Sequence, residues 1–79
     1  MRLDKLPFST PATVVSVRWN DLTPSEAKRL RNLGLDEGVR VEALHGGLIG
    51  RDPLAIRIGR MMVAIRRSCA QTISVDTAA

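Results

Sequence analysis

The residue types that most often carry out chemistry in proteins are sparse in this sequence. The chain has one cysteine, Cys69, and one histidine, His45. A thiol and an imidazole can act as nucleophile and base, but the pair needs a third group to orient the base, and no spacing marks one out. Cys69 lies beside Ala70 in a short apolar segment, where a cysteine usually acts as a small buried hydrophobic residue. We therefore expect no enzymatic activity.

Metal ligands are equally few. A dedicated site needs three or four ligands, and the chain has no CxxC or HxxxH spacing that would supply them. The side chains that could converge on an ion are His45, Cys69, Asp52 and Glu42. The glycine-rich stretches also lack the GxxxxGK[ST] pattern of a phosphate-binding loop. The sequence therefore predicts no resident metal and no cofactor.

The charge balance makes an anionic partner conceivable. Twelve Lys and Arg residues face eight Asp and Glu residues, so the net charge is +4 and the pI is about 10.6. The basic cluster Lys28–Arg31 is interpreted first as a solvated helix face, because acidic residues are interspersed along the chain. Barrels that bind single strands stack bases on aromatic side chains. Phe8 and Trp19 are the only aromatic residues, and both lie outside the predicted strands, so no nucleic acid is expected.

One helix is clearly signalled. In Thr23-Pro24-Ser25-Glu26, the Thr23 side chain can accept from the Glu26 amide while the Glu26 side chain reaches back to the Thr23 amide. Proline is favoured at the first helical position. Gly34 can take the left-handed conformation that closes a helix, with Leu35 folding back onto it. The pattern predicts a helix from Pro24 to Leu33.

The remaining elements are short strands. The first eleven residues are interpreted as an irregular lead-in, and Leu48-Ile49 as a connecting piece between glycine-rich turns. Gly59-Arg60 between two apolar runs is typical of a tight hairpin. The predicted strands are Ala12–Arg18, Val39–Leu44, Leu54–Ile58, Met61–Arg66 and Thr72–Val75. Five short strands and one early helix favour a small closed or partly open barrel over an open sheet covered by one helix.

Length and composition indicate one domain spanning residues 1–79. A single cysteine rules out an internal disulfide and suits a reducing compartment. The N-terminal residues contain no apolar leader, and the longest apolar run, Met61–Ile65, is far shorter than the roughly 20 residues that span a bilayer. We therefore expect a cytoplasmic protein.

Three segments taken together resemble the FeoA family of bacterial ferrous iron uptake. They are RLRNLGLDEGVRV from Arg29 to Val41, GRDPL from Gly50 to Leu54, and VAIRR from Val63 to Arg67. The resemblance extends from about Leu3 to Val75. It implies a mainly β, SH3-like small barrel with one short α-helix inserted after the first strand. Cys69 departs from the family pattern, which more often has an acidic residue there.

The resemblance also implies a function. Members of this family are accessory or regulatory partners of FeoB, a membrane transporter of Fe²⁺ with a cytoplasmic GTPase domain. We therefore expect this chain to bind the cytoplasmic part of FeoB, and to reach the inner membrane only through that partner. The candidate contacts are Arg29, Arg31, Leu33, Leu35, His45, Arg51 and Asp52. The alternatives are a small-barrel nucleic-acid-binding protein and a metal-responsive sensor.

Overall fold

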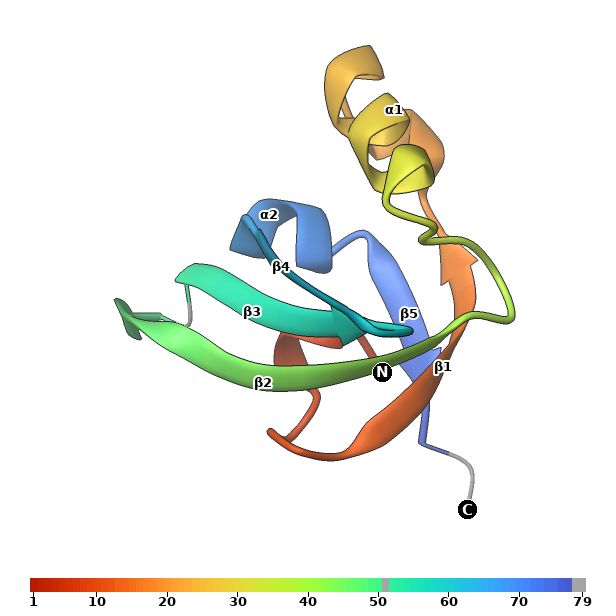
Figure 1. Cartoon of the computed structure of the whole chain (residues 1–79). Coiled ribbons are helices and arrows are strands. Elements are labelled where there is room, and N and C mark those ends of the chain that lie inside the picture. Colours follow the sequence, from red (N-terminus) through yellow and green to blue (C-terminus); the bar gives the residue numbers. More distant parts are fainter. Residues whose placement is uncertain (51, 78–79) are drawn as a thin grey trace.

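Five antiparallel strands form one strongly bent sheet with the order β4-β3-β2-β1-β5 (Figure 1). The structure, a computed structural model, describes residues 1–50 and 52–77. The strands are β1 (Pro11–Val17), β2 (Arg40–Ile49), β3 (Asp52–Ile58), β4 (Met61–Ile65) and β5 (Ile73–Asp76). The helical segments are η1 (Leu3–Lys5), η2 (Trp19–Asp21), α1 (Pro24–Asn32) and α2 (Arg67–Ala70), of which η1 and η2 are 3-10 turns.

The predicted order of elements is confirmed. Helix α1 follows the first strand, and the other four strands come after it. Strands β3 and β4 form the expected hairpin, with Ile58 opposite Met61 and Gly59 at a φ of +59°. The short helix α2 lies directly before the last strand. The sheet curls instead of lying flat, so one of its faces encloses the apolar core (Figure 1).

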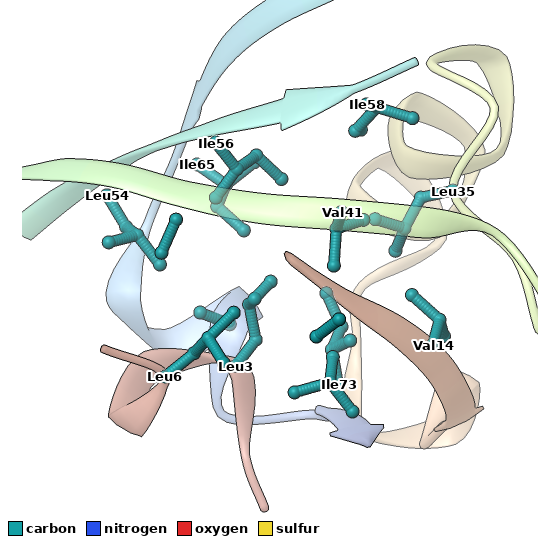
Figure 2. Close-up of a cluster of buried hydrophobic side chains, with 14 of the residues drawn as sticks. Leu3, Leu6, Val14, Leu35, Val41, Leu54, Ile56, Ile58, Ile65 and Ile73 are labelled. Carbon is teal, nitrogen blue, oxygen red and sulfur yellow. The ribbon is translucent and has the colours of Figure 1, made fainter. Parts of the chain in front are cut away.

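The N-terminal lead-in is more ordered than the sequence predicts. It contains η1, and the side chains of Leu3 and Leu6 are fully buried in the core (Figure 2). Asp4 is buried too, with its carboxylate 3.0 Å from Arg2 Nε and 3.8 Å from Arg67 Nε. Two opposite charges offset the cost of burying this carboxylate. The expectation of an irregular segment was wrong because these residues pack against distant parts of the chain.

Strand β2 is also longer than predicted. It continues through the glycines at 46 and 47 to Ile49, where a turn and a connecting piece were expected. A Cβ atom at Gly47 would collide with the carbonyl group of Asp52, so glycine is needed there for the two strands to lie close together. The register with β3 shifts between Ala43 and His45 and again between Gly46 and Ile49. The sequence predicts that the strand ends at these glycines. In the structure they instead lie within the β2–β3 pair, close to the places where its register shifts.

The core draws on every strand. Figure 2 shows side chains from all five strands, from η1 and from the segment after α1 converging on one cluster. Side chains at the centre of this cluster, such as Leu54, Ile56 and Ile73, have no exposed surface. Helix α1 contributes Leu30, which is 2% exposed, and the rest of this helix extends away from the sheet (Figure 1). Leu30 therefore anchors one face of α1 in the core.

Candidate functional site

A surface groove lies between the first turns of α1 and the junction of β4 with α2. Its volume is about 320 Å³. The lining residues are Thr23, Ser25, Glu26, Arg29, Leu30, Ile65, Arg66 and Cys69, and we call this set the α1–α2 groove. Leu30 and Ile65 provide an apolar floor, while Arg29 and Arg66 provide positive charge.

The N-terminus of α1 is fixed by the predicted capping box. The Glu26 amide donates to Thr23 Oγ1 at 3.1 Å, and the Thr23 amide donates to Glu26 Oε1 at 2.9 Å. Pro24 occupies the first helical position. The cap satisfies two donors that would otherwise lack partners, so the helix begins at a defined residue. This start places the Glu26 side chain in the groove.

Cys69 contacts this cap from α2. Its Sγ donates to Glu26 Oε2 at 3.3 Å, and the cysteine is 6% exposed, as expected for a buried apolar residue. Burial raises the pKa of the Cys69 thiol, and the hydrogen bond and negative charge of Glu26 raise it further. The hydrogen bonds from Thr23 and Cys69 in turn lower the pKa of Glu26, with the Thr23 backbone amide as the largest cause. A protonated thiol and a carboxylate are therefore the stable pair.

The two candidate arginines of α1 point to different surroundings. Arg29 reaches across the groove, and its Nη2 donates to the backbone oxygen of Ala64 in β4 at 3.2 Å. The Arg31 guanidinium lies over the Trp19 ring, 4.4 Å from its centroid, which is a cation–π contact. Arg29 and Arg31 are both exposed. Arg31 therefore occupies one face of the indole, on which a nucleobase could otherwise stack.

The two candidate leucines differ in accessibility. Leu35 has no exposed surface, so the structure removes it from the set of side chains that a partner could contact. The reason is the end of α1, where the Leu35 amide donates to Leu30 O at 3.0 Å and Gly34 takes a φ of +87°. This turn directs Leu35 into the core. Leu33 is partly buried and packs against the same core.

Two candidates near the β2–β3 turn, His45 and Asp52, lie outside the groove. His45 is exposed on β2, opposite Ala55 of β3. Asp52 begins β3, and its Oδ1 accepts from the Arg67 amide at 3.2 Å, which caps the start of α2. Arg51 lies outside the described residues. Of the six candidate contacts that the structure describes, the groove therefore contains Arg29 alone.

The groove also contains residues that the sequence analysis did not select. Arg66 and Glu26 were not named as contacts, and Cys69 was considered only as a nucleophile, a metal ligand or a buried apolar residue. The Arg66-Arg67 pair is a visible basic signal that could have pointed to this place. Across residues 1–50 and 52–77, no three His, Cys, Asp or Glu side chains are grouped so as to hold a metal ion. No helix in that part of the chain is long and apolar enough to cross a membrane.

The bent five-stranded sheet with an inserted helix defines a small SH3-like β domain. The sequence model of the FeoA domain matches residues 1–77, and the chain belongs to the FeoA family. The resemblance seen in the sequence is thereby confirmed. No curated protein matches the chain.

Solved structures agree with this assignment. A zinc-complexed FeoA from Stenotrophomonas maltophilia, described as an SH3-domain protein, is 38% identical with a TM-score of 0.77. The match covers 96% of this chain and 89% of that one. A FeoA protein from Chlorobium tepidum is 31% identical with a TM-score of 0.82, covering 95% and 68%. Iron(II) transport protein A from Clostridium thermocellum shares the fold, with a TM-score of 0.83 at 24% identity. The match covers 96% of this chain, which spans 44% of that protein.

Proposed function

We propose that this chain is an accessory protein of ferrous iron uptake that binds the cytoplasmic part of the FeoB transporter. The observation that carries the proposal is the FeoA domain match over residues 1–77. The S. maltophilia relative supports it, since that protein is described as a candidate activating factor of bacterial ferrous iron transport. The activity is protein recognition, and the chain regulates transport without carrying out a reaction.

The surface of α1 suits such a contact. Leu30 anchors the helix, and its arginines at 29 and 31 are exposed. Exposed positive charges speed association with an acidic surface and make it salt-dependent. Leu33 and the groove floor add apolar area beside these charges. Binding to one conformation of the transporter more tightly than to another then shifts the balance between the two.

The test is a pull-down with the tagged protein from detergent-solubilised membranes of iron-starved cells, with mass spectrometry to identify what is retained. We expect enrichment of the FeoB transporter, and its loss in the variant Arg29→Glu/Arg31→Glu. The matched control is Lys5→Glu/Arg40→Glu, which makes the same charge change at exposed positions outside α1. If the α1 variant and the control variant retain the same amount of transporter at low salt, the face of α1 is not part of the interface. Absence of the transporter from all samples would contradict the proposed function.

A further inference from the structure

Strand β4 is a sheet edge that the described part of the chain leaves uncovered along most of its length. It stands at one end of the strand order and pairs with β3 alone. The opposite edge, β5, is covered by the N-terminal residues, since Arg2 forms a bridge with Ser74 and the Val75 amide donates to Met1 O at 2.7 Å. Unpaired backbone groups on an edge strand can pair with another chain.

The register shows which backbone groups of β4 point outward. In a hairpin with a two-residue turn, the residues that close the turn exchange hydrogen bonds, and every second residue along the strand then faces the free side. Ile58 and Met61 close this turn, so the outward positions are Met62 and Ala64. The Arg29 side chain confirms the phase independently, because it reaches Ala64 O from outside the sheet. The Met62 amide and carbonyl and the Ala64 amide therefore point away from β3.

The side chains along this edge are apolar and flanked by arginines. Met61 is 44% exposed and Met62 is 63% exposed, while Arg57 and Arg60 are exposed at the hairpin end. Arg29 and Arg66 lie at the other end, in the α1–α2 groove. The sequence from residue 53 to residue 75 holds four arginines and no Asp or Glu. The nearest carboxylate in the groove, Glu26, already accepts from Thr23 and Cys69.

We propose that β4 is a strand-addition site for an extended acidic segment of a partner protein. The proposal deepens the proposed function, since it names the surface and the kind of segment that binds. Side chains of neighbouring strands line up in rows on each face of a sheet. An added strand with alternating acidic and apolar residues would set its acids beside the Arg57–Met62 row and its apolar side chains beside Met61 and Val63.

Charge decides between the possible occupants. A second copy pairing through its own β4 would bring two arginine-rich edges together, which is unfavourable. A nucleic acid has no peptide groups that could form strand hydrogen bonds with the outward amides. Strands β3 and β4 also carry no aromatic residue on which bases could stack. A carboxylate is also a stronger acceptor for Arg29 than the neutral Ala64 carbonyl it now contacts. An acidic peptide segment thus satisfies both the backbone and the arginines.

The test is a titration of the ¹⁵N-labelled full chain with an acetylated and amidated peptide of four Glu-Val repeats, followed by NMR. We expect the largest shifts at the Met62 and Ala64 amides, and none with the matching Lys-Val peptide. Met62→Pro should weaken binding at least tenfold, because it removes an outward N–H without breaking a bond to β3. Arg60→Glu should weaken it several-fold, whereas the control Lys5→Glu should not. Thermal melting establishes whether each variant is folded. If Met62→Pro does not fold, the Arg60→Glu variant alone tests whether the peptide binds at β4.

Four results would overturn the proposal. They are peptide shifts confined to regions other than β4, equal binding of both peptides, concentration-dependent shifts at Met62 and Ala64 without peptide, and equal shifts there with a dT8 oligonucleotide. The pull-down separates this proposal from the proposed function. Transporter recovery that survives both Met62→Pro and Arg60→Glu would overturn the strand-addition site and leave the accessory role standing.

Discussion

The Cys69 thiol donates a hydrogen bond to Glu26 Oε2 across 3.3 Å, and this contact joins α2 to the first turn of α1. The other oxygen of the same carboxylate accepts from the Thr23 amide. Glu26 therefore caps its own helix and also holds a residue 43 positions further along the chain. Glu26 and Cys69 both line the groove, so this contact forms part of its wall.

Cys69 should react slowly with alkylating reagents. The thiolate is the reactive form, and burial together with Glu26 raises the pKa of the thiol above its usual 9.0. We expect alkylation by iodoacetamide at pH 8 to be about tenfold or more slower in the native protein than in urea, since both access and ionisation are reduced. Glu26→Gln should speed the native reaction by removing the negative charge. Equal rates in the native and unfolded protein would contradict the burial of this thiol.

Removing the helix cap should cost stability. Thr23→Ala removes the side-chain acceptor for the Glu26 amide, and we expect the free energy of unfolding to fall by about 1 kcal/mol. Urea denaturation followed by circular dichroism measures the change. Ser25→Ala is the matched control, since Ser25 is an exposed hydroxyl residue in the same turn and no contact of its side chain enters the cap. A loss as large in the control would show that the cap is not the cause.

The pH dependence of stability should include Glu26. Hydrogen bonds lower the pKa of its carboxyl in the folded state below the ordinary value of 4.5. A lowered folded-state pKa stabilises the protein above the unfolded-state value, and this contribution is lost as the pH falls below 4.5 and through the folded-state pKa. Urea midpoints measured from pH 7 to pH 3 should therefore fall less steeply in Glu26→Gln than in the wild type. Parallel curves would exclude this carboxyl as a source of the acid sensitivity.

The two leucines that flank Gly34 should differ in their effect on stability. Leu35→Ala empties a fully buried position, and we expect a loss of about 2–5 kcal/mol, enough to unfold a large fraction of a small domain. Leu33→Ala should cost less, because that side chain is only partly buried. Chemical denaturation of both variants provides the comparison. A smaller cost for Leu35→Ala than for Leu33→Ala would contradict the structure of this turn.

Local sequence signals predicted the elements that depend on local contacts. Thr23 and Glu26 lie three residues apart, and their mutual hydrogen bonds need no other part of the chain. The same holds for the turn at Gly34 and for the hairpin at Gly59. Combined over several segments, such signals were enough to identify the family, because much of the family pattern consists of turn and core residues.

The errors lie where distant residues meet. Glycines suggested a turn after His45, yet β2 continues there because β3 approaches closely enough to require glycine at 47. The first residues lack a periodic pattern, but Leu3 and Leu6 fill a part of the core that only the folded sheet creates. Leu35 was expected among the contacts, and the fold buries it.

The sequence by itself determined the helix with its cap, the hairpin, most strand positions and the family, because these follow from residues a few positions apart. Only the tertiary structure decided the α1–α2 groove and the uncovered edge of β4. Arg29 and Ala64 are 35 positions apart, and Glu26 and Cys69 are 43 apart. Such residues meet because strands far apart in the sequence pair with one another, and that long-range pairing is a property of the whole sheet that no local pattern encodes.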